Sequence, residues 1–378
     1  MRFLFACGGT AGHINPAVGV AGRLKQLMPG SEFLFIGAEG KMEMELVPHE
    51  GYDIRPVRIT SLSREHSRAG LKHNLEAVKN LAEAIPACRH IIKEFQPDVV
   101  IGTGGYVCYP VLTAAAHLGI PTCVHESNAE PGLTTPLLEN SVNLIMVGFE
   151  EARANYKHPQ KVRVTGTPVR QGFSAGDKTE AKKALGLDAD VPLVVSVWGS
   201  LGATEMNKTV ACVIGMGMQE RKFRMVHSAG KRGIEGMTKY MRDELGLSGW
   251  DEAGFEVKDY IYNMPQLMSA ADLVLCRSGA STLAELTAIG KPAVLVPSPN
   301  VVANHQEKNA RVLERADGAV VLVESEATAE TIYRTVCDLL ETPGRLDAMS
   351  SNMRDMAVEN ATDEIASLVL GLAVPNEE

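Results

Sequence analysis

The sequence predicts an α/β protein built from two Rossmann-like domains that face a cleft. Its 378 residues exceed the size of one ordinary domain. In four places an apolar, strand-like run leads into a turn containing glycine and then into a segment with helical periodicity. Continuous apolar strands that alternate with helices are typical of parallel sheets covered on both faces. In such folds, ligands bind at the carboxyl ends of the strands.

The four repeats of this pattern divide evenly between the two halves of the chain. Their strands are expected at residues 3–6, 99–101, 193–197 and 273–276. We therefore place a first domain at residues 1–165 and a second domain at residues 166–349. The charged helical pattern that follows, at about residues 350–378, is expected to form a C-terminal helix that packs back on the first domain.

The composition is that of a globular protein without a basic field. Lysine and arginine number 37 against 46 acidic residues, and the net charge of −9 argues against nucleic acid as a partner. The seven cysteines are scattered, several of them inside apolar runs, and are expected to be buried free thiols. Residues 99–124 lack charged side chains, but glycines and prolines interrupt them, so no membrane span is expected.

Glycine-rich turns before helices commonly bind phosphate, because the backbone approaches the anion closely and its N–H groups point at it. The first turn fits a dinucleotide fingerprint poorly, since the first, third and sixth positions hold Gly8, Thr10 and His13. Glu39 follows the second expected strand, where a ribose-binding acid would lie, so an NAD site stays open as an alternative. The Walker pattern is absent, and the acidic pair at 188–190 is interpreted as a solvated turn.

A set of short motifs occurs in order along nearly the whole chain. They are Gly8-Gly9-Thr10-Ala11-Gly12-His13, Gly104-Gly105-Tyr106, His125-Glu126-Ser127-Asn128, Gly166-Thr167-Pro168-Val169-Arg170, Gly199-Ser200-Leu201-Gly202-Ala203 and Cys276-Arg277-Ser278-Gly279-Ala280. This ordered set resembles the MurG family of N-acetylglucosaminyltransferases, which have two Rossmann-like domains in the GT-B arrangement. The chain departs from the family pattern at Ala11, often glycine, at Thr167, often asparagine, and at Trp198 and Leu201 beside the second-domain turn.

The resemblance implies a glycosyltransferase of peptidoglycan synthesis, and so of cell-wall biogenesis, cell shape and cell division. Such an enzyme transfers GlcNAc from UDP-GlcNAc, with inversion, to the C4 hydroxyl of MurNAc in undecaprenyl-pyrophosphoryl-MurNAc-pentapeptide (lipid I) and forms lipid II. A single in-line displacement explains the inversion, and it needs a base for the acceptor hydroxyl and stabilisation of the departing diphosphate. The expected location is peripheral, on the cytoplasmic face of the bacterial cell membrane.

The resemblance also implies which residues bind the UDP-GlcNAc donor, mainly in the second domain. They are Thr10, Ala11, Gly12, Asn128, Arg170, Ser200, Ile261, Ala280, Ser281, Thr282, Leu283, Ala284, Glu285 and Gln306. Backbone amides near Leu283 and the side chain of Ser200 would hold the diphosphate, and Ile261 would pair with the uracil. Glu285 would accept hydrogen bonds from the ribose; the alternative is an exposed acid in the first turn of a helix.

Three further donor residues have their own roles in this interpretation. Asn128 and Gln306 would meet the sugar. Arg170 would lie near the nucleotide, and a structural salt bridge is its alternative role.

The acceptor diphosphate is expected at the glycine turns of the first domain. The residues are Gly9, Gly104, Gly105 and Tyr106, acting mainly through backbone amides. Three residues are candidates for the base: His13, His125 and Glu126. His13 heads a helix beside a phosphate turn, so it could instead orient the acceptor diphosphate. No protein-bound cofactor or metal is expected, and any Mg²⁺ would accompany the phosphates of the acceptor.

A helical segment at residues 64–85 combines basic and apolar side chains. Its basic members are Arg64, Arg68, Lys72 and Lys79, and its apolar members are Leu71, Leu75, Val78, Leu81 and Ile85. This combination predicts a basic amphipathic helix on the anionic cytoplasmic membrane surface. Because Glu76 and Glu83 dilute the charge, an ordinary half-buried helix remains the alternative.

Two other functions fit much of the same sequence. A UDP-GlcNAc 2-epimerase would share the two-domain architecture and the donor site, but it would not need a basic helix on the lipid side. A non-catalytic nucleotide-sugar-binding subunit would keep the second-domain motifs and dispense with His13 and with His125-Glu126. Both alternatives stay open at the level of the sequence.

Overall fold

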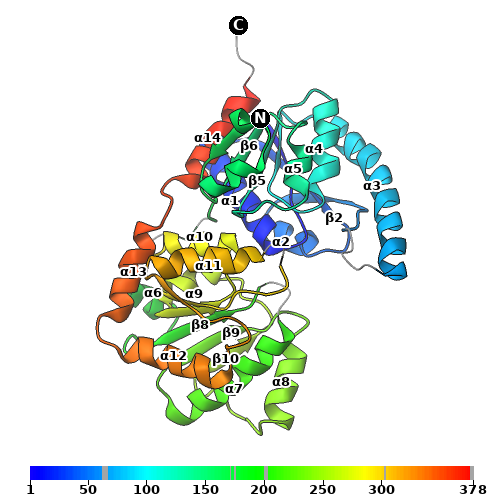
Figure 1. Cartoon of the computed structure of the whole chain (residues 1–378). Coiled ribbons are helices and arrows are strands. Elements are labelled where there is room, and N and C mark those ends of the chain that lie inside the picture. Colours follow the sequence, from blue (N-terminus) through cyan, green and yellow to red (C-terminus); the bar gives the residue numbers. More distant parts are fainter. Residues whose placement is uncertain (62–66, 171, 174–175, 200–202, 302–303, 375–378) are drawn as a thin grey trace. The chain divides into compact units, whose positions relative to one another are not determined.

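The computed structural model describes residues 1–61, 67–170, 172–173, 176–199, 203–301 and 304–374 (Figure 1). The chain forms two compact units. Unit 1 is Met1–Gln171 together with Asn360–Glu378, and unit 2 is Gly172–Glu359. The expectation of two parallel-sheet α/β domains is confirmed, and the first division of the chain lies after residue 171, whereas the sequence placed it after residue 165.

Within its described residues, unit 1 contains a seven-stranded parallel sheet of order β3-β2-β1-β4-β5-β6-β7. The strands are β1 (Arg2–Ala6), β2 (Glu32–Ala38), β3 (Asp53–Val57), β4 (Val99–Gly102), β5 (Thr122–Glu126), β6 (Leu144–Val147) and β7 (Val162–Val164). The strand order turns back beside β1, where β2 pairs on one side and β4 on the other. In doubly wound sheets this is where ligands bind, at the carboxyl ends of the strands.

Helices cover both faces of the unit 1 sheet (Figure 1). One layer contains α3 (Arg68–Phe95), α4 (Cys108–His117) and α5 (Thr134–Leu138), and the other contains α1 (Ala11–Leu27), α2 (Glu43–His49) and α14 (Ala361–Ala373). Two short 3₁₀ turns, Glu150–Asn155 and Pro159–Lys161, connect β6 to β7. Because each face is covered, the central strands β1, β4 and β6 are mostly apolar, whereas the edge strand β3 carries the exposed Asp53 and Arg55.

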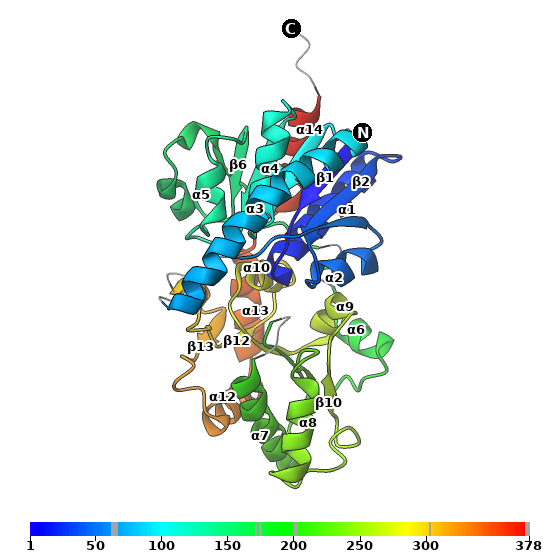
Figure 2. The same cartoon turned by 90° about the vertical axis from the view of Figure 1, so that its right-hand side faces the viewer.

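Unit 2 repeats the architecture with six parallel strands in its described residues, in the order β10-β9-β8-β11-β12-β13. The strands are β8 (Leu193–Val197), β9 (Arg224–Ser228), β10 (Phe255–Lys258), β11 (Leu273–Cys276), β12 (Ala293–Leu295) and β13 (Ala319–Val321). The helices are α6 (Lys178–Ala184), α7 (Thr204–Glu220), α8 (Ile234–Asp243), α9 (Met264–Ala270), α10 (Ala280–Ala288), α11 (His305–Arg315), α12 (Ala329–Glu341) and α13 (Arg345–Asp355). α7, α8 and α12 pack together on one core (Figure 2). α10 contacts α11 and α13 (Figure 1).

The C-terminal segment is two helices and not the single one expected at 350–378. α13 stays in unit 2, where Met349 and Met353 are buried and the Ser350 hydroxyl donates to Gly290 O at 2.7 Å. The backbone then turns at Asn360, which has a positive φ of 62°, and α14 joins unit 1. There Asp363 accepts a hydrogen bond from Arg23 of α1 at 2.5 Å.

The seven cysteines are free thiols, as the sequence predicted. Six are buried, and Cys212 is partly exposed. Burial raises the pKa of the Cys88, Cys123 and Cys276 thiols to about 12, with the nearby Glu285 carboxylate adding to the effect at Cys276. Thiols held in this way stay protonated and behave as small apolar side chains.

Candidate active site

His13 lies in the first turn of α1, at the carboxyl edge of the unit 1 sheet. The helix begins after Thr10, whose backbone is extended, and the glycine turn lies between it and β1. The Nδ1 atom of His13 lies 2.9 Å from the carbonyl oxygen of Gly8, so Nδ1 carries the proton and donates it. Among the described residues, His13 Nε2 makes no hydrogen bond. Its lone pair is therefore available to accept a proton.

The second glycine turn provides room for this histidine. Gly104 and Gly105 have positive φ values of 109° and 86°. A Cβ on Gly104 would lie 2.5 Å from His13 Cδ2, and one on Gly105 would lie 2.2 Å from the Gly8 oxygen. The Thr103 hydroxyl donates to the His13 carbonyl at 2.7 Å. The turn at 102–106 therefore fixes His13, and its expected role in binding a diphosphate stays a prediction.

The amide of Gly9 is already engaged, which changes the expectation for that residue. It donates at 3.2 Å to Glu43 Oε2, and Glu43 Oε1 accepts from the Ala38 amide at 2.9 Å. Gly9 therefore offers no N–H to an anion in this arrangement. The sequence interpretation overlooked Glu43, which is fully buried, and considered in this region only the exposed Glu39, as the ribose-binding acid of the NAD alternative.

Tyr106, expected at the acceptor diphosphate, packs beside the same turn. Its ring would lie 3.4 Å from a Cβ on Gly9. Burial, and secondly the charge of Glu43, raise the pKa of its phenol, so the hydroxyl stays protonated and can donate a hydrogen bond.

His125 and Glu126 are both saturated with hydrogen bonds. His125 is fully buried, with Nε2 2.9 Å from Gly166 O and Nδ1 3.3 Å from the Ser127 hydroxyl. Burial lowers the pKa of this imidazole, despite the hydrogen bond to Gly166 and the charge of Glu126. Because burial disfavours the protonated form of His125, the structure favours His13 over His125 as the base.

The Glu126 carboxylate organises the loop that follows β5. Its Oε1 accepts from the backbone and side-chain amides of Asn128 at 3.1 and 3.0 Å. Its Oε2 accepts from the Gly132 amide and the Thr135 hydroxyl, both at 3.1 Å. Asn128 Nδ2 donates to Glu126, and within the described residues Asn128 Oδ1 makes no hydrogen bond. Asn128 can therefore accept a hydrogen bond from a sugar.

In unit 2, α10 begins directly after the turn at the carboxyl end of β11. Gly279 precedes the helix without a side-chain cap, an arrangement that suits an anion. The Leu283 amide already donates to Gly279 O at 3.0 Å. An anion at this helix would therefore meet the amides of Ala280 and Thr282 rather than that of Leu283. The other predicted members, Ser281 and Ala284, lie in the same two turns.

Glu285 is buried in the second turn of α10. Both descriptions drawn from the sequence, a helix start and an exposed first-turn acid, are corrected by this position. The cause is the start of α10 at Ala280, five positions earlier. A carboxylate near a nucleotide site and shielded from water makes stronger hydrogen bonds than an exposed one.

Gln306 is held with its amide NH₂ available. Its Oε1 accepts from the Ser298 amide at 2.9 Å, and its carbonyl accepts from the buried Ser278 hydroxyl at 2.8 Å. Neighbouring residues of the same loop and helix help to line a pocket, formed by Pro297, Pro299, Asn304, Glu307, Val323, Glu324 and Ser325. The Gln306 NH₂ can donate a hydrogen bond to a polar ligand.

The remaining residues predicted to bind the donor lie in several different parts of the chain. Ile261 is buried between β10 and α9, and its N–H and C=O make no hydrogen bond within the described part of the chain. Such an unpaired edge suits a nucleobase. Arg170 is half-buried near the end of unit 1, and its backbone packs on Gly19 of α1. Ser200 and Leu201 lie outside the described residues, while Ala11 and Gly12 open α1.

A buried network of hydrogen-bonded side chains, which no sequence motif indicated, lies at the end of β8. Trp198 Nε1 donates to Ser196 Oγ at 3.0 Å, and Ser196 Oγ lies 3.0 Å from His227 Nδ1. His227 Nε2 lies 3.2 Å from Asn207 Oδ1, and Asn207 Nδ2 donates to Ala229 O at 2.8 Å. Only one assignment of donors and acceptors satisfies all of these groups. In that assignment the His227 imidazole is neutral.

Arg277 packs on the other side of Trp198. Its guanidinium lies over the indole, 5.3 Å from the ring centroid, and Nη1 donates to the carbonyls of Val296 and Pro297 at 3.0 and 3.1 Å. It also forms an ion pair with Glu324. Trp198 thus links the end of β8 to the loop after β12.

The apolar side chains of α3 form two separate stripes. Ala77, Asn80, Ala84, Cys88 and Ile92 are buried, and Leu81 and Ile85 pack beside them on the core. Leu71, Leu75 and Val78 lie on another face and are 64%, 66% and 60% exposed. Lys72 and Lys79 are exposed beside them; Arg64 lies outside the described residues, as does the side chain of Arg68. The expected single amphipathic face is therefore corrected to a buried stripe and an exposed one.

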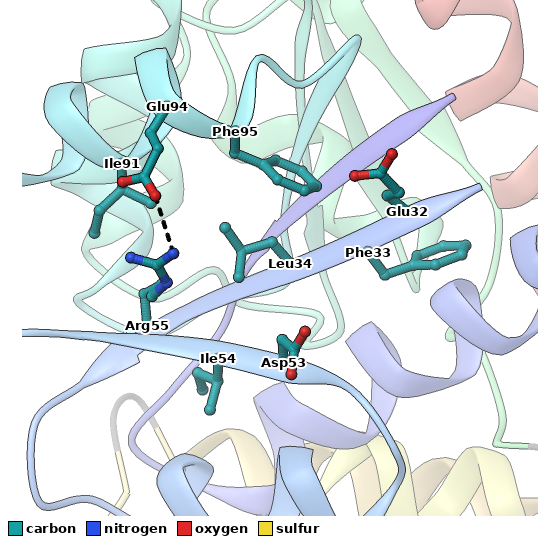
Figure 3. A pocket seen from close by; sticks show the side chains of 9 residues that line it. All are labelled: Glu32, Phe33, Leu34, Asp53, Ile54, Arg55, Ile91, Glu94 and Phe95. Atoms are coloured by element: carbon teal, nitrogen blue, oxygen red, sulfur yellow. Dashed lines mark hydrogen bonds and ion pairs between the residues drawn. The ribbon is translucent and has the colours of Figure 1, made fainter. Parts of the chain in front are cut away.

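A pocket at the opposite edge of the unit 1 sheet carries none of these residues (Figure 3). Its lining comes from the amino ends of β2 and β3 and the last turn of α3: Glu32, Phe33, Leu34, Asp53, Ile54, Arg55, Ile91, Glu94 and Phe95. Arg55 and Glu94 pair across it at 3.2 Å. Since parallel sheets bind ligands at the carboxyl edge, this pocket is separate from the candidate site.

The described residues contain neither a candidate metal centre nor a candidate membrane span. No three His, Cys, Asp or Glu side chains gather in them as a group that could hold a metal ion. Among the described helices, none is long and apolar enough to cross a membrane.

Known proteins resemble this chain in both sequence and structure. The glycosyltransferase family 28 N-terminal domain matches residues 3–147, and the C-terminal domain of that family matches residues 193–365. An Acinetobacter baumannii MurG structure has a TM-score of 0.68, 26% identity and coverage of 98% of this chain and 99% of its own. The UDP-N-acetylglucosamine–N-acetylmuramyl-(pentapeptide) pyrophosphoryl-undecaprenol N-acetylglucosamine transferase of Acetivibrio thermocellus is 39% identical over 369 residues, 98% of this chain and 97% of that protein. This chain belongs to the MurG family.

The wider comparison agrees with this family assignment. The transferase of the same name from Halalkalibacterium halodurans is 37% identical and matches 99% of this chain and 100% of its own length. A UDP-GlcNAc 2-epimerase from Neisseria meningitidis has a TM-score of 0.66 at 15% identity, which shows a shared fold alone. As a member of the MurG family the chain is a glycosyltransferase, and the predictions of fold and enzyme class are confirmed.

Proposed function

We propose that this chain transfers N-acetylglucosamine from UDP-N-acetylglucosamine to the C4 hydroxyl of MurNAc in undecaprenyl-pyrophosphoryl-MurNAc-pentapeptide, forming lipid II. Membership of the MurG family supports the choice of substrates. The observation that carries the chemistry is the contact between His13 Nδ1 and Gly8 O, at 2.9 Å. It turns the lone pair of Nε2 away from the turn, where it can take a proton from a sugar hydroxyl.

The donor is assigned to unit 2. The open start of α10 would meet the diphosphate through the amides of Ala280 and Thr282, and Glu285 would bind the ribose hydroxyls. Ile261 would pair with the uracil, and the Gln306 NH₂ would donate to the sugar or its phosphate. Positive ends of backbone dipoles aimed at the leaving diphosphate stabilise the charge that develops as the glycosidic bond breaks.

The acceptor is assigned to unit 1. His13 Nε2 would remove the C4 hydroxyl proton as the oxygen attacks the anomeric carbon on the face opposite UDP, which inverts the configuration. The Tyr106 hydroxyl and the turn at 102–106 are available to the acceptor diphosphate. Any Mg²⁺ would accompany the paired phosphates of the acceptor, which offer the hard oxygen ligands that this ion prefers.

A lipid-linked acceptor requires access to a bilayer, and α3 supplies a suitable surface. Leu71, Leu75 and Val78 follow a spacing of four and three residues, so they share one exposed face of the helix. Lys72 and Lys79 flank this face and suit anionic headgroups. We place the protein on the cytoplasmic face of the cell membrane through this face, as a peripheral protein.

The deciding experiment supplies UDP-GlcNAc with a lipid-linked muramyl-pentapeptide acceptor and measures UDP release and the new glycosidic linkage. Transfer with inversion supports the proposal. Incubation with UDP-GlcNAc alone tests the shared-fold alternative, since an epimerase would form UDP-ManNAc without acceptor. Binding of UDP-GlcNAc without either reaction would indicate a binding subunit and overturn the proposal.

A further inference from the structure

Glu43 is a fully buried carboxylate that the proposed mechanism does not use. It is the first residue of α2, five positions after β2 ends. A buried carboxylate is costly unless hydrogen bonds satisfy it. Both of its oxygens accept backbone N–H groups, Oε1 from Ala38 at 2.9 Å and Oε2 from Gly9 at 3.2 Å.

Two glycines make the space that Glu43 occupies. A Cβ on Gly8 would lie 2.3 Å from Glu43 Oε1, and a Cβ on Gly37 would lie 2.5 Å from its Cγ. The φ of Gly37 is not positive, so its backbone conformation does not require glycine. Glycine is needed here because a side chain would occupy the space of Glu43. The first turn and the end of β2 are thus shaped around this side chain.

The peptide group between Gly8 and Gly9 lies between Glu43 and His13. Its N–H, on Gly9, donates to Glu43 Oε2, and its C=O, on Gly8, accepts from His13 Nδ1 at 2.9 Å. Glu43 therefore fixes the orientation of the Gly8–Gly9 peptide group. That peptide group in turn fixes the imidazole of His13. A carboxylate on the N–H also polarises the peptide, which strengthens the acceptor oxygen and the hydrogen bond that His13 donates to it.

We propose that Glu43 is a positioning residue for the base, acting on His13 through the Gly8–Gly9 peptide group. It fixes the Nδ1–H tautomer, which keeps the Nε2 lone pair available for the acceptor hydroxyl. Gly9 has a positive φ of 87°, a region in which glycine moves easily, so the peptide group needs such an anchor. The inference rests on the proposed role of His13 as the base.

Glu43→Gln is the first test. Glutamine has nearly the same size but only one acceptor oxygen, so it cannot satisfy both amides. Gly37→Ala is the second, since its Cβ would displace the Glu43 side chain and leave the carboxylate chemistry intact. Glu45→Gln, an exposed position on the same helix, is the matched control. Loss of an outer hydrogen-bonding partner is expected to lower kcat by about 10–100-fold.

Three measurements separate positioning from a general loss of structure. Affinity for UDP, bound by unit 2, should be unchanged in both variants, while kcat falls. Nitrogen-15 NMR of histidine-labelled protein should show His13 as the Nδ1–H tautomer in the parent and in Glu45→Gln. The Nε2–H tautomer should gain population in Glu43→Gln and Gly37→Ala. The His13→Asn spectrum identifies the signals.

Several results would overturn the inference. One is parental kcat in a folded Glu43→Gln enzyme, and another is a lowered kcat with an unchanged His13 tautomer. If neither variant folds, the parent spectrum alone decides: an Nε2–H tautomer at neutral pH contradicts the arrangement. A parent that transfers no sugar to the lipid-linked acceptor would instead reject the proposed function, whatever the tautomer.

Discussion

His227 Nδ1 and Ser196 Oγ lie 3.0 Å apart inside unit 2, where both side chains are fully buried. Asn207 Oδ1 accepts a hydrogen bond from Nε2–H of His227, so Nδ1 accepts from the serine hydroxyl and has no place for a second proton. Burial lowers the pKa of this imidazole to about 3. The contact makes His227 a structural histidine, neutral across the physiological range.

This burial predicts a dependence of stability on pH. The unfolded imidazole titrates near pH 6.5, so below that value the unfolded chain binds a proton that the folded unit refuses. The free energy of unfolding of unit 2 should therefore fall between pH 6.5 and pH 3, by up to about 1.4 kcal/mol per pH unit from His227. Denaturant unfolding followed by fluorescence measures it, since Trp198 and Trp250 both belong to unit 2. In His227→Gln this component should vanish, and an equal slope in parent and variant would contradict the prediction.

Replacement of His13 separates chemistry from donor binding. His13→Asn keeps the size and a hydrogen-bonding group and removes the titratable nitrogen. If His13 is the base, kcat should fall by about 10²–10⁴-fold, and UDP affinity should stay at the parental value. If it only orients the acceptor diphosphate, the acceptor KM should rise while kcat falls less. A fully active variant would exclude both roles and return attention to His125 and Glu126.

Glu285→Ala tests the ribose contact in the donor site. A hydrogen bond to a charged group contributes about 1.5–3 kcal/mol, so calorimetry should show UDP binding weakened by about 10–150-fold. Glu235→Ala, an exposed acid in the first turn of α8, is the matched control and should bind UDP as the parent does. Equal affinity in Glu285→Ala and the parent would remove Glu285 from the donor site.

The exposed stripe of α3 can be tested with vesicles. Changing Leu71, Leu75 and Val78 to serine removes apolar area that a bilayer would bury, at about 25 cal/mol per Å². Sedimentation with anionic vesicles should fall by at least tenfold, without loss of fold, because the buried stripe is untouched. Leu133 and Leu137, exposed at α5, form the control pair. Equal release by the control pair, or no binding by the parent, would contradict the assignment to α3.

The architecture could be predicted because its signals are local. The strands at 193–197 and 273–276 coincide with β8 and β11, since continuous apolar runs bounded by turn residues are sufficient to define buried parallel strands. The turns beside them followed from glycine positions. The start of α10 did not, because Gly279 carries no capping side chain to mark it. Glu285 was therefore assigned to the wrong turn.

The candidate site could be predicted only in part, because some of its contacts join segments that are far apart in the sequence. His13 stands in a motif, whereas Glu43 acts on a residue 34 positions away, and only the pairing of β1 with β2 brings the two segments together. The stripes of α3 show the same limit. Leu75 and Ile85 are equally apolar, and only packing against the sheet decides that Ile85 lies inside and Leu75 outside.

The return of α14 has a consequence for how the chain is made. Residues 172–359 form unit 2 and stand as an insertion within unit 1, which is completed only by the helix at Ala361–Ala373. Ile365, Ala366 and Val369 are fully buried in the same core as α1. On the ribosome the first 171 residues therefore emerge early but wait with an open apolar face, while unit 2 can fold as soon as it has left the exit tunnel. Residues 1–171 are synthesised before unit 2 but complete their core only after it.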